Sequence, residues 1–199
     1  MAQVIIRRST IDLAGLPQTI RDEHARFLRN WRDALVTFGP ILRGAAPAGY
    51  LYQTDLPGNV PEAVARFMAE DPLAVHGVVE TDEIGDWHCA LPTRQATAPI
   101  RPGLKGFFFH GIGKPGITDF RNTIVPAHRA HLQQRDAGNC LSRGYLTDAG
   151  GQVWLGSAMV YEFASRAALD AFFRDEPYCT NGIYEKIEIY DWQRGAMAS

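Results

Sequence analysis

Two histidines occupy matching places in the two halves of this 199-residue chain, and each is followed 47 residues later by a carboxylate. The pair is His24 and Asp71 in the first half, and His128 and Asp175 in the second. A histidine titrates near neutral pH, so it can accept and return a proton. A carboxylate on its other ring nitrogen would set the tautomer and raise its basicity. The spacing therefore predicts one His–Asp dyad for general acid–base chemistry in each half of the chain.

The acid of the second half has two candidates. Asp71-Pro72 and Glu176-Pro177 are the matching acid–proline steps of the two halves. Aligned on proline, the counterpart of Asp71 is Glu176; aligned on the distance from the histidine, it is Asp175. Either carboxylate can serve His128. The alternative for both histidines is a structural role, in which each packs on a helix and bonds a carbonyl.

Two arginines and a serine are candidates for binding substrate. Arg121 and Arg143 can hold a carboxylate through paired hydrogen bonds. Ser157 follows a glycine on a predicted strand and can donate a hydrogen bond to a ligand. The alternatives are surface ion pairs for the arginines and an ordinary strand position for the serine.

His131 lies one helical turn after His128 and shares its predicted helix face, so it is a further substrate-binding candidate. A His-x-x-His pair can also hold a divalent metal. No third ligand stands at a suitable spacing, and the first half has Phe27 in the matching place. The sequence therefore predicts no metal site.

The elements that must position these residues are also repeated. Each half shows the coarse order strand, helix, strand, helix, strand. The expected segments are 4–6, 19–38, 49–53, 61–70 and 77–87 in the first half, and 106–111, 126–134, 153–161, 165–173 and 183–190 in the second. Antiparallel strands with helices on one face predict a ferredoxin-like α+β unit. The predicted organisation is a first repeat at 1–91, a proline-rich linker at 92–103 and a second repeat at 104–195.

Composition excludes several classes of function. The chain is 46% hydrophobic and 21% charged, with a net charge of −2. It has no basic stripe, so we expect no nucleic-acid partner. It has no apolar stretch of about 20 residues and no apolar N-terminal run long enough for a signal peptide, so we expect no membrane association. Its three cysteines are odd in number and indicate free thiols in the cytoplasm.

The order and spacing of the repeated motifs resemble those of the YCII-related proteins, which belong to the dimeric α+β barrel class. The second half carries Lys114-Pro115-Gly116, Arg121, His128-x-x-His131-Leu132, Arg143-Gly144, Gly156-Ser157, Asp175-Glu176-Pro177-Tyr178, Gly182-Ile183-Tyr184-Glu185 and Glu188-Ile189-Tyr190-Asp191-Trp192. The first half carries a weaker set: Arg21, His24, Arg43-Gly44, Gly49, Asp71-Pro72, Gly77 and Trp87. The resemblance implies two fused ferredoxin-like βαββαβ-type repeats that form an intrachain dimeric α+β barrel.

The resemblance also implies a class of chemistry. Characterised relatives include dehydrochlorinases of aromatic degradation, and muconolactone isomerases share the broader fold; neither requires a metal or organic cofactor. We therefore expect a cofactor-independent lyase or isomerase whose partner is a small unsaturated carboxylate, lactone or phenol-derived substrate. The second half is favoured because it carries more of the pattern. The alternative is a non-catalytic ligand- or partner-binding module. An exposed sheet edge would make a homodimer possible.

Overall fold

Eight antiparallel strands close into one barrel in the computed structural model, which describes residues 2–58, 60–91, 93–136 and 138–195. Around the ring the strands follow the order β1-β3-β2-β8-β5-β7-β6-β4. Strands β1 to β4 come from the first half of the chain, and β5 to β8 come from the second. The predicted α+β fold of two ferredoxin-like repeats is confirmed. Pro92, the first residue of the predicted linker, lies outside the described residues.

The two halves have the same order of elements. The first consists of β1 (Ala2–Arg8), the 3-10 helix η1 (Leu13–Gly15), α1 (Gln18–Asn30), β2 (Leu35–Arg43), β3 (Ala46–Asp55), α2 (Val60–Glu70), α3 (Pro72–Val75) and β4 (Thr81–Cys89). The second consists of β5 (Lys105–Gly113), α4 (Thr118–Arg135), β6 (Cys140–Thr147), β7 (Trp154–Phe163), α5 (Arg166–Arg174), α6 (Pro177–Thr180) and β8 (Tyr184–Trp192). Within each half the strands lie in the sequence 4-1-3-2, the order of a ferredoxin-like sheet.

The halves are joined by pairing the last strand of each with the second strand of the other. β4 pairs with β6 from Asp86 opposite Thr147 to Cys89 opposite Gly144. β8 pairs with β2 at Trp192 opposite Ile41 and at Asp191 opposite Leu42. Among the described strands the ring has no free edge, so it removes the sheet edge on which the expectation of a homodimer rested. A homodimer stays a prediction.

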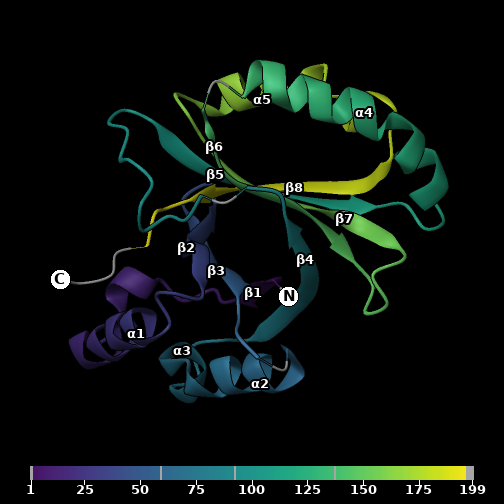
Figure 1. Ribbon diagram of the computed structural model, residues 1–199. Helices are drawn as coiled ribbons and strands as arrows, with labels where there is room; N and C mark the ends of the chain where they lie inside the picture. The colour runs from purple at the N-terminus through teal and green to yellow at the C-terminus, as the bar shows by residue number, and fades with distance from the viewer. Residues whose placement is uncertain (1, 59, 92, 137, 196–199) are drawn as a thin grey trace.

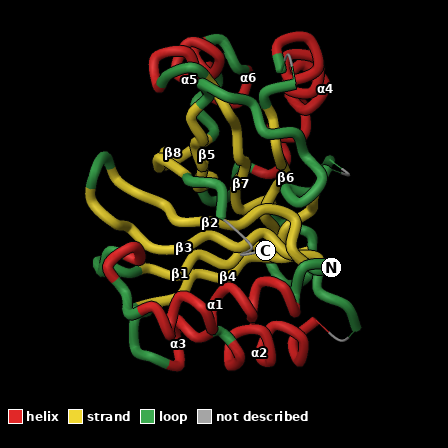
Figure 2. Tube along the Cα trace, turned by 90° about the vertical axis from the view of Figure 1, so that its left-hand side faces the viewer, coloured by secondary structure: helices red, strands yellow, loops and turns green. Residues whose placement is uncertain are grey.

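Helices cover the barrel on two opposite sides (Figures 1 and 2), with α1, α2 and α3 over the first half-sheet and α4, α5 and α6 over the second. Strand side chains alternate between the two faces of a sheet. Inward-facing residues such as Val4, Leu51, Phe108 and Val160 fill the barrel. Outward-facing residues form one further core under each helical layer. The cavities at His128 and His24, described below, lie in these outer layers, between helix and sheet.

Two predicted helix boundaries were wrong. The helix expected over 19–38 ends at Asn30, and residues from Leu35 onward form β2 instead. The run Leu35-Val36-Thr37-Phe38 is rich in branched and aromatic residues, which favour a strand. The helix expected from Pro126 begins eight residues earlier, at Thr118, and carries Pro126 in its interior. β2 and β6 had no counterpart in the coarse prediction, because glycine or proline interrupts both segments.

The repeated acid–proline step begins a one-turn helix in each half. Asp71 is the N-cap of α3 and Glu176 is the N-cap of α6, and each is followed by proline in the first turn. A cap carboxylate accepts from the free N–H groups of the helix start, and proline is suited there because it lacks an N–H. Two residues after the end of each short helix comes a glycine of positive φ, Gly77 at 67° and Gly182 at 59°. These local rules fix the direction of each acidic side chain.

The described linker residues, 93–103, contain no helix or strand, yet they are bound to both halves. The backbone N–H of Phe38 donates to Gln95 Oε1 at 2.9 Å, and Gln95 Nε2 donates to the carbonyl of Gly195, also at 2.9 Å. Gln95 is buried. The linker is therefore part of the packed structure and lies beside the C-terminal segment.

No helix of the described residues is long and apolar enough to cross a membrane. Cys89, Cys140 and Cys179 are free thiols, as the odd number predicted. The cytoplasmic location stays a prediction.

Candidate functional site

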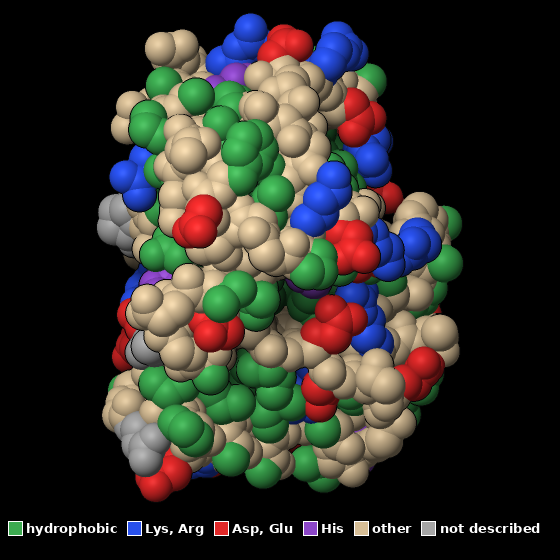
Figure 3. Space-filling view, turned by 90° about the vertical axis from the view of Figure 1, so that its right-hand side faces the viewer, with side chains coloured by type: hydrophobic (Ala, Val, Ile, Leu, Met, Phe, Trp, Pro, Cys, Tyr) green, Lys and Arg blue, Asp and Glu red, His purple; other side chains and the backbone are tan. Residues whose placement is uncertain are grey.

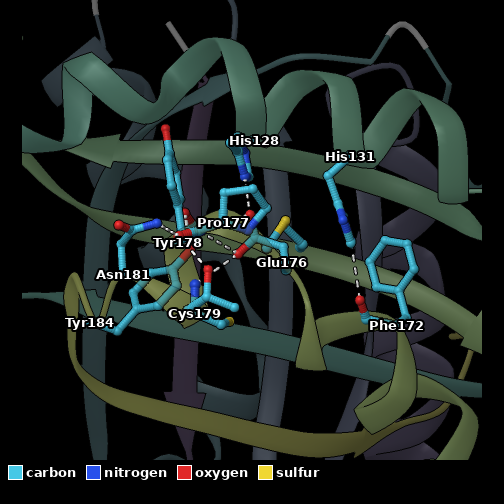
Figure 4. Close-up of polar contacts among 12 residues, drawn as sticks. His128, His131, Phe172, Glu176, Pro177, Tyr178, Cys179, Asn181 and Tyr184 are labelled. Carbon is cyan, nitrogen blue, oxygen red and sulfur yellow. Dashed lines mark hydrogen bonds and ion pairs between the residues drawn. The ribbon is translucent and has the colours of Figure 1, made fainter.

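His128 and Glu176 form a close pair beneath α4 (Figure 4). Nδ1 of His128, from the third turn of α4, lies 2.6 Å from Oε1 of Glu176, the N-cap of α6. Glu176 is 1% exposed, and the His128 side chain is 13% exposed. A histidine of α4 and an acid more than forty residues later therefore meet, as the repeat predicted, with Glu176 as the partner.

Asp175, the other predicted partner, does not reach His128. It is the C-cap of α5, its side chain is 62% exposed, and its carboxylate lies 3.5 Å from Arg135. The prediction of a His128–Asp175 dyad was wrong, because the residue that precedes the proline takes the cap position and turns inward. Alignment on the proline gives the correct partner, and alignment on the distance from the histidine does not.

The environment of Glu176 keeps it charged. Burial alone would raise the pKa of its carboxyl. The hydrogen bond and charge of His128, with the backbone N–H groups of Tyr178 and Cys179, outweigh burial and lower that pKa below its ordinary value. A carboxylate at this position accepts from Nδ1–H of His128. That bond fixes the proton on Nδ1 and leaves Nε2 as the basic nitrogen.

Tyr178 supports the imidazole from one side. Its ring is stacked on that of His128, with 3.8 Å between centroids and 3° between planes. Tyr178 is almost fully buried, and its hydroxyl has no hydrogen-bond partner among the described residues. Burial, opposed by the charge of Arg121, raises the pKa of this hydroxyl to about 12. It therefore stays protonated near neutral pH.

His128, Arg121, Arg143 and Ser157 line one cavity of about 360 Å³. The cavity lies between α4 and the outer face of β6 and β7, and Tyr178 forms part of its wall. A volume of this size is in the range of small-molecule sites. Four of the sequence candidates thus line the same cavity, although the outermost two, Arg121 and Ser157, are 36 residues apart along the chain.

Arg121 stands in a cage of aromatic rings within this cavity. Its guanidinium carbon lies 5.1 Å from the ring centroid of Tyr145, 5.6 Å from that of Trp154 and 5.5 Å from that of Tyr178. Its hydrogen bond goes to the neutral amide oxygen of Asn122 at 3.1 Å, and Nε has no partner among the described residues. The described residues give it no ion pair with a carboxylate. The cation is therefore available to an anionic ligand.

Arg143 and Ser157 contribute differently. Arg143 is paired with Asp136 at 3.2 Å, so its charge is largely neutralised. The Ser157 hydroxyl accepts a hydrogen bond from Tyr184 at 3.0 Å, which orients its oxygen toward Tyr184. Of the two predicted arginines, Arg121 is the stronger candidate for binding an anion.

The structure does not bring His131 to the cavity. Its Nε2 lies 3.1 Å from the carbonyl oxygen of Phe172, and its ring packs edge-on against the Phe172 ring (Figure 4). His131 lies three residues after His128 on α4, and at this position its side chain faces α5 and not β6 and β7. In the parts of the chain that the structure describes, no group of three or more His, Cys, Asp or Glu residues could hold a metal ion.

The first half arranges the same residue types differently. Nε2 of His24 lies 2.8 Å from the hydroxyl of Tyr52, which in turn donates to Asp71 Oδ2 at 2.9 Å. Asp71 also lies 3.0 Å from Nε of the buried Arg7. The predicted direct His24–Asp71 dyad was therefore wrong: a tyrosine stands between the two residues, and the carboxylate serves a buried ion pair.

Side-chain length explains the difference between the halves. Glutamate is one methylene longer than aspartate, so Glu176 reaches His128 from the same cap position at which Asp71 falls short of His24. The gap in the first half is filled by Tyr52, whose counterpart on β7 is Met159. Burial raises the pKa of Asp71, and the charge of Arg7 opposes it. In the first half, His24 is therefore connected to Asp71 through the Tyr52 hydroxyl and has no carboxylate bonded to its ring.

Another cavity, at one mouth of the barrel, is lined by acidic and basic side chains that pair with one another. Glu188 lies 2.9 Å from Lys186, 3.3 Å from Arg43 and 3.6 Å from Arg8, and Arg8 also pairs with Glu83 at 2.8 Å. Acidic and basic side chains likewise lie beside one another on the face shown in Figure 3. Arg43, the sequence counterpart of Arg143, belongs to this network. The mouth is therefore a less suitable anion site than the cavity at Arg121.

Comparisons with known proteins agree with this architecture. A sequence profile of the YCII-related domain matches residues 107–193. The protein YciI of Escherichia coli O6:H1 is 31% identical over 80 residues, which are 37% of this chain and 82% of that protein. The chain belongs to the YCII-related family. The match of the YCII-related domain includes His128 and Glu176, and it lies wholly within the second half.

Solved structures share the fold of this YCII-related chain. A proposed monooxygenase from Fusobacterium nucleatum is 12% identical, with a TM-score of 0.63, and the match covers 97% of this chain and 91% of that one. A 5-chloro-2-hydroxyhydroquinone dehydrochlorinase from Burkholderia phenoliruptrix is 20% identical, with a TM-score of 0.42, and the match covers 45% of this chain and 95% of that one. At 12% identity the likeness to the Fusobacterium nucleatum structure shows the fold alone. Enzymes occur among these neighbours.

Proposed function

We propose that the chain is a cofactor-independent enzyme that transfers a proton in an elimination or isomerisation reaction. The substrate is an unsaturated carboxylate, a lactone or a phenol-derived compound that carries negative charge. His128 is the general acid–base, Glu176 orients and charges it, and Arg121 binds the anionic group. The 2.6 Å contact between Nδ1 of His128 and Oε1 of Glu176, beside a cavity that holds Arg121, carries this proposal.

The geometry supports the following proton path. Nε2 of His128 takes a proton from a substrate carbon, and the imidazolium that forms is stabilised by the Glu176 carboxylate. In an elimination, the electron pair of the broken C–H bond forms a double bond, the leaving group departs as an anion, and His128 returns its proton to water. In an isomerisation, Nε2–H returns the proton to a different carbon. A positioned base of this kind contributes about 10²- to 10⁴-fold in rate.

Arg121 and His128 can act on one small substrate because both lie on the same helix. They are seven residues apart on α4, or two turns, so they share a face and are separated by about 10 Å along the helix axis. This distance separates the anionic end of the substrate from the carbon that loses its proton. The Tyr178 hydroxyl provides a neutral donor between them.

Deuterium exchange tests the proposal without knowledge of the natural substrate. Muconolactone and chlorinated hydroxyhydroquinones would be incubated with the protein in D₂O, with exchange followed by NMR and chloride release measured separately. We expect His128→Asn and Glu176→Gln to lower kcat by about 10²- to 10⁴-fold. Arg121→Met should mainly raise KM, by about tenfold to a hundredfold, because it removes a charge-assisted contact.

Asp175→Asn is the matched control, because it removes the neighbouring carboxylate and leaves Glu176 in place. Its rates should stay within about twofold of the wild type, since the side chain is exposed and away from the cavity. Equal losses in Asp175→Asn and Glu176→Gln would contradict the assignment of the dyad.

The alternative is an anion-binding module without catalysis, and the cation of Arg121 favours it as a second candidate. Such a module would bind these compounds with an affinity that depends on Arg121 while promoting neither exchange nor chloride release. Calorimetric titration of the same compounds, run beside the exchange assay, separates the two functions. Binding that survives His128→Asn, with no turnover in the wild type, would favour the module.

A further inference from the structure

We propose that the cavity of the first half is a second binding site, for an uncharged and largely apolar small molecule that carries a hydrogen-bond donor such as a hydroxyl. The cavity has a volume of about 520 Å³ and lies between α1 and the outer face of β2 and β3. It is the repeat counterpart of the cavity at His128, but its chemistry is different. The proposal does not depend on catalysis in the second half.

The walls of this cavity are mostly hydrocarbon. Leu13, Leu16, Ile20, Leu28 and Leu73 line it from η1, α1 and α3, and prolines of β2 and β3 complete the sheet side. The C-terminal segment closes one side, where the Gly195 N–H donates to Phe38 O at 3.1 Å. Apolar walls with a small number of polar groups are typical of sites for uncharged ligands.

The charged groups at the rim already make hydrogen bonds within the chain. Both Nη1 bonds of Arg21 go to backbone carbonyls, Ala14 at 2.6 Å and Leu16 at 2.7 Å, and its Nη2 donates to Gln18. Arg194 bonds three linker carbonyls and Glu162, the last at 3.0 Å. The carboxylate of Asp12 caps η1 through the Ala14 N–H. These groups are held by several bonds within the chain, whereas the caged Arg121 makes one, to Asn122. The first cavity therefore offers an anionic ligand fewer available guanidinium donors than the second.

The relay at His24 defines the group that the cavity can recognise. Because Tyr52 donates its only proton to Asp71, its oxygen accepts from Nε2–H of His24. The His24 ring, which lines the cavity, then keeps Nδ1 as an acceptor. Burial, with the charge of Arg7 adding to it, lowers the pKa of His24 to about 4, so the ring stays neutral near physiological pH. A neutral acceptor matches an O–H or N–H donor on the ligand.

The aromatic groups also differ between the halves. The ring of Tyr50 meets that of His24 edge-on, with 4.8 Å between centroids, and takes the strand position that Ser157 has in the second half. Leu73 replaces Tyr178, so no phenol stacks on His24. In the second half the tyrosine beside the histidine is Tyr178, on the helix side of the cavity. In the first half it is Tyr50, on the sheet side. The first cavity therefore offers an apolar floor and an edge-on ring to a flat ligand.

A matched pair of probes and a matched pair of variants test the proposal. The probes are 2-naphthalenemethanol, which is neutral, and 2-naphthoate, its charged analogue, both titrated into the full chain by calorimetry. Ala25→Trp fills the first cavity and Ala90→Trp fills the second. We expect Ala25→Trp to weaken binding of the alcohol at least tenfold and Ala90→Trp to leave it within twofold. In Ala90→Trp the acid should bind at least tenfold more weakly than the alcohol, and the affinity for the alcohol should be constant from pH 5.5 to 8.

Ala45→Trp is a second filling variant, in case Ala25→Trp does not fold, because Ala45 is exposed in the turn between β2 and β3 and lines the same cavity. Circular dichroism and the melting temperature establish folding for each variant. The proposal is overturned if the wild type does not bind the alcohol. It is also overturned if the folded first-cavity variants bind the alcohol as the wild type does, or if 2-naphthoate binds Ala90→Trp as tightly as the alcohol.

Discussion

The neutral state of His24 predicts a specific loss of stability in acid. In the folded protein, burial and then the charge of Arg7 lower the pKa of this histidine from 6.5 to about 4. In the unfolded chain the ring titrates near its ordinary value. Between these two pKa values the unfolded state binds more protons than the folded state, so the free energy of unfolding falls as the pH falls through this window.

The size of the effect follows from the two pKa values. A difference of about 2.5 in pKa corresponds to ~3.4 kcal/mol once the pH is below both values. At pH 5 the unfolded ring is almost fully protonated and the folded ring is mostly neutral, which gives about 2 kcal/mol. Part of the ring faces the cavity, so solvent screening makes these figures upper values.

Urea unfolding of the wild type and His24→Phe at pH 8 and pH 5 isolates this contribution. The difference between the two proteins at pH 8 measures the lost bond to Tyr52 and does not depend on titration. The wild type should lose about 2 kcal/mol more than His24→Phe when the pH is lowered to 5. If both proteins lose the same free energy to within about 0.5 kcal/mol, His24 titrates normally in the folded protein, and burial and the charge of Arg7 do not hold it neutral.

Three further changes have expected effects on the free energy of unfolding. Phe67→Ala should cost about 3–5 kcal/mol in chemical denaturation, because the ring is fully buried against Phe27 and Trp31; a loss below about 1 kcal/mol would mean that α2 is not firmly packed. Ser165→Ala should cost about 1 kcal/mol, since its hydroxyl caps α5 through the Ala168 N–H; retention of full stability would show that the cap is replaced by water. Gly182→Ala should cost about 1 kcal/mol because φ is 59°, although an added Cβ would meet nothing nearer than Lys114 Nζ at 3.9 Å. Gly15→Ala, also in open space but without positive φ, is its control, and equal effects of the two would rule out backbone strain as the cause.

The repetition in the sequence located the two candidate histidines because both copies had to fold onto the same framework. His128 meets a carboxylate since the acid–proline step is a local rule: a capping side chain and a proline in the first turn determine its direction in any context. The same rule favours Glu176 over Asp175. The repeat could not show how long the acidic side chain must be to reach the histidine, because that length depends on the distance between α4 and α6.

Other parts of the site depend on contacts between distant segments. Arg121 shares a helix face with His128 only because α4 begins at Thr118, and Pro126 made an earlier start unexpected. The aromatic cage around Arg121 joins Tyr145, Trp154 and Tyr178 from β6, β7 and α6, and no local pattern relates them. Tyr52 stands between His24 and Asp71 because of strand register, which is set by the whole sheet.

The crossed pairing of β4 with β6 and of β8 with β2 has a consequence for how the two cavities can change. In a barrel made from two identical chains, each substitution occurs in both subunits, and the assembly separates on dilution. Here ring closure is intramolecular, so its effective concentration is fixed by the linker and not by the amount of protein. A substitution alters only one cavity, while the strands of the other half continue to complete the barrel. One covalent chain can therefore keep a glutamate beside one histidine and a tyrosine beside the other, an asymmetry that a homodimer of identical chains could not encode.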